Sequence, residues 1–340
     1  MKEKIKAYLK RYFIDAMGAM AQGLFASLLI GTIFNTLGTY LGLDFLCEIN
    51  NSAKAVTGAA IGVAIAYSLK AHPLVIYSSA AVGYLANALG VTIGDKNPTA
   101  GPAGAFFAVI IAAEIGMLVS RRTKVDILVT PTVTILVGFG AARLLCPGIA
   151  YLMYYLGEFV NTATELQPFF MGIIVSVVVG VVLTLPISSA ALCAMIGITG
   201  IAGGAAAVGC CCQMVGFAVC SFRENKWNGL VSQGLGTSML QMGNICRRPQ
   251  IWIPPTLAAA VCGPVSTMVF KLKCTGVSAG MGTCGMVGPI GIITDSGTEG
   301  VTWAGVALCC IVLPAVVSLA VCEIMRKVGW IRFGDMKLDT

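Results

Sequence analysis

Apolar runs of about 18–22 residues recur along the whole chain, and a helix needs this length to cross a hydrocarbon core of roughly 30 Å. Only 11% of the 340 residues are charged, whereas soluble domains carry roughly 25%. The chain therefore lacks the polar surface that a water-soluble fold must present. We predict an all-α polytopic membrane protein that lies in a lipid bilayer.

The apolar runs predict about ten transmembrane helices within a single transmembrane domain, 1–340. The expected spans are 14–40, 53–70, 73–93, 100–120, 127–147, 168–186, 188–205, 206–222, 250–272 and 302–325. Both ends of the chain are basic, and residues 1–13 form an amphipathic lead-in that we place on the cytoplasmic surface. The positive-inside rule then predicts that both termini are cytoplasmic, which requires an even number of crossings.

Three segments do not fit as ordinary spans. Segment 148–167 is amphipathic and rich in tyrosine, so we place it at the membrane interface. Segments 228–249 and 274–299 are glycine-rich and polar, and such irregular backbone is tolerated at membrane depth only where protein or water covers it. We predict that these two are re-entrant hairpins entering from opposite sides, which is a recurrent way to build a transporter binding site. In the alternative, their glycines only allow tight helix packing.

The fourteen cysteines do not predict disulfides or a metal site. Most of them lie in apolar runs, where cysteine serves as a small hydrophobic residue. The chain has a single histidine and no C-x-x-C pair, so the usual ligand spacing of a zinc site is missing. No nucleophile–base pair or nucleotide-binding loop is evident either. We expect no metal, no cofactor, no catalytic residue of its own and no nucleic-acid partner.

Several long motifs are similar to those of a known family. They are "KVDILVTPTVTILVG", "LPISSAALCAMIGITGIAGGAAAVGC", "QMVGFAVCSFREN", "GLVSQGLGTSMLQMGN", "IWIPPTLAAAVCGPVSTMVF" and "SAGMGTCGMVGPIG". They resemble the IIC-like membrane family of the phosphotransferase system, which includes sugar transporter subunits IIC and PfoR-type regulators of Firmicutes. The similarity covers nearly the whole chain, about 10–335.

The resemblance implies a permease in the bacterial cell membrane. IIC permeases work with IIA and IIB proteins, which pass a phosphoryl group to the sugar. This chain contains no soluble stretch of about 100 residues, the size of a small domain, for those steps. Any phosphorylation therefore requires separate IIA and IIB partners, and we expect the permease to be a homodimer.

Two residues of the first half are candidates for contact with a small polar solute. Glu114 is the only carboxylate deep within an apolar run, where a charge costs about 2.5–3.5 kcal/mol on insertion scales. It could bind solute or carry a coupling proton; alternatively, it is a protonated carboxyl bonded to a neighbouring helix. His72 precedes a proline at the start of the third span, and it is either a sugar contact or a structural, interfacial histidine.

Four uncharged polar residues lie within spans rich in small residues. They are Asn87, Ser188, Ser189 and Gln213. The two serines follow Pro186 at the start of a predicted helix, where free N–H groups could receive a hydroxyl or an anion. Ser189 could equally be an N-cap without a ligand. Gln213 offers two donors and an acceptor to a sugar, or it ties two helices together.

The two predicted hairpins supply the remaining candidates. The first carries Gln233, Thr237, Ser238, Gln241 and Asn244, and the second carries Ser278 and Thr283. An uncharged, polyhydroxylated solute is selected by several neutral hydrogen bonds in a partly dry site. We expect Gln241 and Asn244 to lie near polar groups of 278–288. In the alternative, the polar groups of each hairpin satisfy one another.

Two classes of function are compatible with these residues. The first is an IIC-like permease that moves a small polar solute, such as a sugar or sugar derivative, by alternating access. The second is a membrane-embedded sensor of PfoR type that binds a ligand and signals through a partner. Glycine-rich hairpins and polar groups at membrane depth are costly features for a mere anchor. The sequence therefore favours transport.

Overall fold

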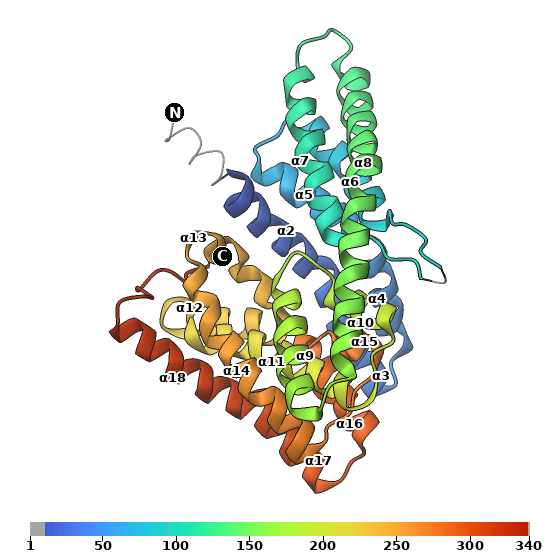
Figure 1. Cartoon of the computed structure of the whole chain (residues 1–340). Helices are drawn as coiled ribbons and strands as arrows, with labels where there is room; N and C mark the ends of the chain where they lie inside the picture. Colours follow the sequence, from blue (N-terminus) through green and yellow to red (C-terminus); the bar gives the residue numbers. More distant parts are fainter. Residues whose placement is uncertain (1–10, 95, 339–340) are drawn as a thin grey trace. The chain divides into compact units, whose positions relative to one another are not determined.

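The computed structural model describes residues 11–94 and 96–338, and it divides into two compact units. Unit 1 is Met1–Tyr154 and unit 2 is Tyr155–Thr340. The described residues form helices and connecting loops, with two isolated bridges, Gly90–Thr99 and Ile93–Lys96, in the loop before α7 (Gly101–Val119; Figure 1). The all-α prediction is confirmed. The expected single domain stays a prediction, and most of the expected lead-in, 1–13, lies outside the described residues.

Unit 1 is built from helices that pack through small residues. Its elements are η1 (Arg11–Ala16), α2 (Met17–Leu24), η2 (Phe25–Leu29), α3 (Ile30–Leu41), α4 (Asp44–Ala55), α5 (Thr57–Ser68), α6 (Pro73–Ala88), α7 (Gly101–Val119) and the first part of α8 (Asp126–Thr164). The backbones of α5 and α6 touch, because a side chain on Gly62 would collide with the carbonyl group of Ser79 and one on Gly83 with that of Gly58. Small residues therefore set the spacing of this helix pair.

Helix α8 differs from the prediction at its second half. It runs unbroken through Pro131 and Pro147 to Thr164, although a span ending at 147 and a separate segment, 148–167, were expected. Each proline removes one intrahelical hydrogen bond without ending the helix. With 39 residues the helix is about 58 Å long. The second half exposes Tyr151 and Tyr155, so its aromatic surface persists although its expected boundary was wrong.

Unit 2 surrounds one central helix. Its elements are α9 (Pro168–Thr184), α10 (Ser189–Ile196), α11 (Gly200–Cys220), α12 (Phe222–Val231), η3 (Ser232–Gly236), η4 (Ser238–Gln241), α13 (Met242–Arg247), η5 (Pro249–Trp252), α14 (Ile253–Pro264), η6 (Val265–Phe270), α15 (Gly276–Ala279), η7 (Cys284–Met286), α16 (Val287–Ser296), α17 (Gly300–Val306), η8 (Ala307–Val312) and α18 (Leu313–Lys327). In the most apolar 18-residue stretch of α11, 89% of the residues are buried, and α9, α14 and α18 pack around this helix (Figure 1). Side chains of α11 thus reach most other elements of the unit.

Two predicted spans at the start of unit 2 are wrong in their boundaries. Instead of 188–205 and 206–222, the chain forms the short helix α10, a left-handed turn at Gly197, and the single helix α11. The eight residues of α10 cover only about 12 Å, too short to cross a bilayer. The backbone after the turn bonds to an extended segment, with Cys274 N donating to Gly200 O and Gly276 N to Ile198 O. Side chains on Gly203 or Gly204 would collide with this segment, so only glycine permits the contact.

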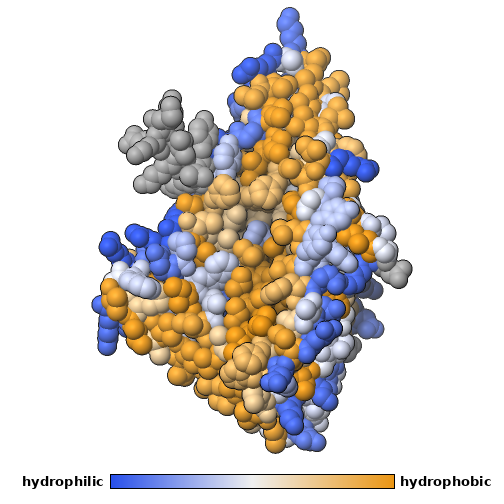
Figure 2. Space-filling view, viewed as in Figure 1, coloured by the Kyte–Doolittle hydropathy of each residue, from blue (hydrophilic) through white to orange (hydrophobic). Residues whose placement is uncertain are grey.

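The surface and the helix lengths confirm a polytopic membrane protein. Six helices among the described residues are long and apolar enough to cross a bilayer, and two shorter apolar helices accompany them. They are Arg11–Thr39, Gly101–Val119, Asp126–Thr164, Gly200–Cys220, Pro249–Phe270 and Gly300–Lys327, with Thr57–Ser68 and Pro168–Thr184 as the shorter ones. Figure 2 shows apolar residues over much of the visible surface, with hydrophilic residues at the turn between α7 and α8 and in separate groups elsewhere. The count of ten crossings stays a prediction.

Candidate functional site

A chain of neutral hydrogen bonds is centred on Gln213, near the middle of α11. The side-chain oxygen of Gln213 accepts from Trp252 Nε1 at 3.1 Å and from Thr184 Oγ1 at 3.4 Å. Its amide nitrogen donates to Thr256 Oγ1 at 3.1 Å. The hydroxyl oxygens of Thr184 and Ser238 lie 2.8 Å apart, which extends the chain to η4. We call these five residues the Gln213 cluster.

Four elements that meet α11, namely α9, η4, η5 and α14, supply the other members of the Gln213 cluster. Thr184 is the last residue of α9, and Ser238 is the first of η4. Trp252 ends η5, and its carbonyl accepts from Thr256 at 2.7 Å. Gln213, Thr184 and Ser238 are fully buried, whereas Trp252 and Thr256 are half-buried. The cluster therefore reaches from the interior of unit 2 toward its surface along the start of α14.

The two glycine-rich segments meet beside this cluster. Thr283, in the turn before η7, donates to the carbonyl of Gly234 in η3 and lies 3.6 Å from the sulfur of Met214. On the other side of the turn, Ser189 donates to the carbonyl of Gly280 at 2.6 Å. The segments 228–249 and 274–299 are thus joined by the hydrogen bond from the Thr283 hydroxyl to the Gly234 carbonyl.

The serine pair before α10 is arranged differently from the expectation. Ser188 is the N-cap, and its hydroxyl accepts from Ala191 N at 3.2 Å. Ser189 is the first residue of the helix and bonds to Gly280, so the expected N-cap role of Ser189 was wrong by one residue. The physical reason is the extended backbone of Ser188, with φ −84° and ψ 93°, which is the conformation an N-cap requires.

Gln233, Gln241 and Asn244 form a second group of amides, the Gln241 network. Gln241 Nε2 donates to Gln233 Oε1 and to the carbonyl of Met336, both at 2.9 Å. Asn244 Nδ2 donates to Gln241 Oε1 at 2.8 Å and to the carbonyl of Lys337 at 2.9 Å. Hydrogen bonds from Gln241 and Asn244 thus reach segment 336–337, whereas we expected polar groups of 278–288. The expected contact between the two hairpins is made by Gly234 instead.

The Gln241 network and Gln213 differ in how many of their amide protons are used. Gln233 Nε2 donates to Ser221 Oγ at 2.9 Å and to Gly229 O at 3.0 Å, so each amide nitrogen of the Gln241 network uses both of its protons. Among the residues that the structure describes, the amide nitrogen of Gln213 makes a single hydrogen bond, to Thr256. An amide has two donor protons, so Gln213 keeps one for a further acceptor. Of the predicted site residues with buried amides, Gln213 is therefore the best placed to bind a solute.

The remaining candidates are spread over both units. Thr237 caps η4, because its hydroxyl accepts from Met239 N at 3.2 Å. Ser278 lies in α15, where it packs against Gly291. Asn87 of α6 packs against Gly58 of α5, in unit 1. His72 also belongs to unit 1; it precedes α6, and its buried Nδ1 has no hydrogen-bond partner within the described part of the chain.

Glu114 forms an ion pair in unit 1. Arg11 Nη2 lies 2.8 Å from Glu114 Oε1, although the angle is not that of a hydrogen bond. Both side chains keep about a third of their exposure, 35% for Arg11 and 31% for Glu114. Arg11 also donates to the carbonyl of Leu69 at 3.2 Å. The positive charge of Arg11 thus balances the negative charge of the Glu114 carboxylate within its apolar helix.

Sequence reasoning missed three members of the Gln213 cluster, namely Thr184, Trp252 and Thr256. A threonine in an apolar run is an ordinary helix residue, so Thr184 gave no signal. Trp252 precedes the pair Pro254–Pro255 at a helix start, where an indole N–H placed among apolar residues needs an acceptor. That requirement is the one clue that was present in the sequence.

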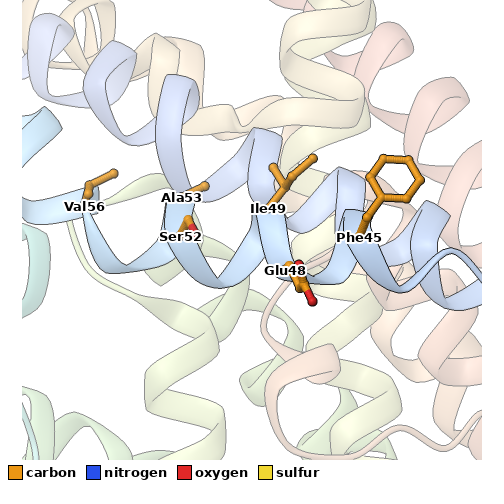
Figure 3. Close-up of a pocket in the computed structure, with 6 residues that line it drawn as sticks. All are labelled: Phe45, Glu48, Ile49, Ser52, Ala53 and Val56. Carbon is orange, nitrogen blue, oxygen red and sulfur yellow. The ribbon is translucent and has the colours of Figure 1, made fainter.

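A pocket of about 630 Å³ lies elsewhere, along α4. It is lined by Phe45, Glu48, Ile49, Ser52, Ala53 and Val56. Figure 3 shows Phe45, Ile49 and Val56 along one edge of the helix, with Glu48 on the other. None of the predicted site residues lines this pocket. Within the described part of the chain, no three His, Cys, Asp or Glu side chains are grouped so that they could hold a metal ion.

Comparison with protein families decides the affiliation. The family model described as "Phosphotransferase system, EIIC" matches residues 14–338. The chain belongs to this family. Comparisons with curated proteins and with solved structures gave no match. As an EIIC protein, the chain is a membrane-embedded, transporter-type component of a sugar phosphotransferase system, of the kind that works with IIA and IIB partners.

Proposed function

We propose that this EIIC chain is a permease that binds a small, uncharged polar solute at the Gln213 cluster. The observation that carries the proposal is the free amide proton of Gln213, a fully buried side chain whose neighbours Trp252 and Thr256 remain half-buried. A ligand site combines apolar walls with a few placed polar groups. The indole of Trp252 supplies such a wall, and the amide and hydroxyl groups supply the polar contacts.

The chemistry of the cluster favours a polyhydroxylated solute such as a sugar or sugar derivative. Its polar groups are one amide, three hydroxyls and one indole N–H, all of them neutral. Neutral donors and acceptors select hydroxyl groups by geometry and leave no charge to attract an ion. Ser189, Ser278 and Thr283 extend the proposed binding surface on the side where the two glycine-rich segments meet.

The broken segments support a mechanism of alternating access. Segments 228–249 and 274–299 consist of short helices separated by turns, including a left-handed residue at Met286. We propose that they are re-entrant hairpins that enter the membrane from opposite sides. Irregular backbone can shift without breaking a long helix, and transporters place such segments at their binding sites. Movement of η3 and η4 would carry Ser238 away from Thr184 and open the cluster.

The proposed setting is a bacterial cell membrane with both termini in the cytoplasm, a homodimeric assembly, and separate IIA and IIB proteins as partners. The basic turn between α7 and α8, with Arg121, Arg122 and Lys124 exposed, supports a cytoplasmic position for that turn. Cysteine-accessibility labelling in intact cells tests the orientation. A reporter placed at 340 should react only after the membrane is opened.

The function is tested on purified protein screened against sugars and related metabolites by thermal shift, followed by binding measurements. Gln213→Met keeps the volume of the side chain and removes its hydrogen bonds. We expect its affinity for the identified solute to fall about 5–150-fold, as for loss of roughly 1–3 kcal/mol of hydrogen bonding. Ser318→Ala is the matched control, because Ser318 Oγ is buried in the same unit and has no hydrogen-bond partner in residues 11–94 and 96–338.

Equal affinity in Gln213→Met and in the control would sink the assignment of this site. Uptake into vesicles of the protein then separates the two classes of function. A permease accumulates or equilibrates the solute. A protein that binds the solute without carrying it across the vesicle membrane is a sensor instead.

A further inference from the structure

Segment 332–338 lies in a polar groove of unit 2. In Figure 1 the chain beyond α18 is the dark red loop that turns back toward α12 and α13. Met336 is fully buried there and Leu338 is 7% exposed, so both apolar side chains are anchored in the unit. By the groove we mean the four polar side chains that hydrogen-bond to the segment, Glu224 and Asn225 of α12, Gln241 of η4 and Asn244 of α13.

The groove recognises the main chain of the segment. Glu224 accepts from the N–H groups of Gly334 at 3.1 Å and Met336 at 3.0 Å. Asn225 accepts from the N–H group of Leu338 at 2.8 Å and donates to the carbonyl of Met336 at 2.8 Å. These N–H groups belong to alternate residues of a segment that is folded into turns over 333–336, where Asp335 N donates to Arg332 O at 3.2 Å and Lys337 N to Gly334 O at 3.3 Å. Side chains of α12 thus bind the main chain of a turn.

Because the Glu224 carboxylate is buried, losing its hydrogen bonds to the segment would cost free energy. The carboxylate of Glu224 is 1% exposed and pairs with Arg326 Nη2 at 3.2 Å, while Arg326 is 10% exposed. A buried carboxylate needs several donors to replace its lost hydration. Two of the donors of Glu224 come from segment 332–338. When the segment leaves, water must enter or the groove must rearrange.

The Gln241 network connects this groove to the Gln213 cluster. Gln241 donates to the carbonyl of Met336, and it closes the same η4 turn that Ser238 opens. Ser238 is the residue that meets Thr184 at 2.8 Å. Segment 332–338 therefore braces η4 on one side while the Gln213 cluster contacts it on the other.

We propose that segment 332–338 is a latch that fixes η3, η4 and α13, and that its release from the groove frees these elements to move away from Thr184. The part of this proposal that concerns the solute rests on the proposed function, because the latch would control access to the Gln213 cluster. The part that concerns the position of η4 rests only on the hydrogen bonds in the groove. A peptide that forms the same turns and presents the same main-chain N–H groups is the chemistry that would replace it.

Hydrogen–deuterium exchange of the full protein in detergent or nanodiscs tests the latch without any solute. Removal of residues 332–340 should speed amide exchange in 232–245 by about tenfold or more, because local opening becomes easier. Addition of a synthetic peptide of residues 330–340 in trans should restore the protection. Lys337→Ala is the matched control, since this side chain is exposed and its main chain is unchanged.

A second variant covers the case in which the truncated chain does not fold. Asn225→Leu removes the bonds to Met336 and Leu338 and leaves the segment in the chain, and we expect it to speed exchange in the same region. Exchange in 232–245 that is as slow in Asn225→Leu and in the truncated protein as in Lys337→Ala would overturn the latch.

Solute binding then separates this inference from the proposed function. Faster exchange on release, with no solute bound by the intact protein, would leave the latch standing and remove the permease site. If the intact protein binds solute, release should change the affinity or the uptake rate by at least about threefold, and the peptide should reverse the change. Equal affinity and uptake in the intact and released proteins would overturn the coupling to the Gln213 cluster.

Discussion

The Gln213 cluster and the Gln241 network are both groups of buried amides in unit 2, yet they use their hydrogen bonds differently. The amides of the Gln241 network donate every proton, partly to main-chain carbonyls of Met336 and Lys337. Gln213 donates one proton and pairs otherwise with side chains from neighbouring elements. A saturated group has nothing left to offer a ligand, whereas an unsaturated one does. The same residue type therefore holds the fold in one place and can bind solute in the other.

This difference assigns different costs to substitutions in the two regions. Loss of a saturated amide leaves buried partners without a bond, so the cost falls on the free energy of unfolding. Loss of the unsaturated amide, Gln213, is expected to lower mainly the affinity for solute. Substitutions in the Gln241 network and the latch groove are therefore expected to act mainly on the free energy of unfolding, and those in the Gln213 cluster mainly on solute affinity.

The largest effect is expected for Glu224→Ala at the latch groove. The change leaves the buried Arg326 and two main-chain N–H groups without their partner. We expect the free energy of unfolding to fall by about 3–5 kcal/mol, the usual cost of breaking a buried ion pair. Denaturant unfolding in detergent measures it. Glu323→Ala is the control, because its pair with Arg223 is partly exposed and should be worth less than about 1 kcal/mol.

Gln241→Ala should lower stability by about 1–3 kcal/mol, because Gln233, Asn244 and the carbonyl of Met336 each lose a buried bond. Thermal unfolding of the purified variant measures the change. A variant as stable as the wild type that no longer binds solute would break the comparison, since Gln241 would then belong to the binding site. The earlier expectation that Gln233, Gln241 and Asn244 contact the solute would then be right.

Thr184→Val preserves shape and removes the hydroxyl that links Ser238 to Gln213. We expect solute affinity to fall about 5–30-fold, or roughly 1–2 kcal/mol, because the Gln213 cluster loses its preorganised geometry. Isothermal titration with the identified solute gives the value. An unchanged affinity would confine the binding site to Gln213, Trp252 and Thr256.

The smallest effect is expected at the ion pair of unit 1. A double-mutant cycle with Arg11→Gln and Glu114→Gln should give a coupling energy of about 1 kcal/mol or less, because both side chains are partly exposed and solvent screens the pair. Uptake of the solute by Glu114→Gln at several pH values measures the second, functional expectation. A pH profile identical to that of the wild type would remove Glu114 from any proton coupling.

The membrane character and most of the long apolar stretches could be predicted from the sequence, because a membrane-spanning helix is recognised by its composition over about 20 residues. The breaks could not be placed. The turn at Gly197 and the extended segment 271–275 depend on contacts between residues far apart, such as Cys274 with Gly200. A continuous run of small apolar residues looks the same whether it forms one helix, as α11 does, or two.

The site was predicted in part and for a similar reason. Gln213 and Ser238 are polar residues within apolar stretches, and this pattern was enough to select them. Their partners Thr184 and Trp252 come from other helices, and no local pattern announces a tertiary contact. The role of Gln241 was hidden because its acceptor is the main chain of Met336, which no side-chain pattern can reveal.

The latch has a consequence for biogenesis. Gly334 follows Glu224 by 110 residues, and at a synthesis rate of about 5–20 residues per second it appears on the order of ten seconds later. For that time Glu224 and Asn225 are made while their main-chain donors are not. Lipid offers no substitute for those donors, so we expect water to fill the groove until segment 332–338 has been made. In a nascent chain the apolar helices would thus be made before Glu224 and Asn225 gain their main-chain hydrogen bonds to segment 332–338.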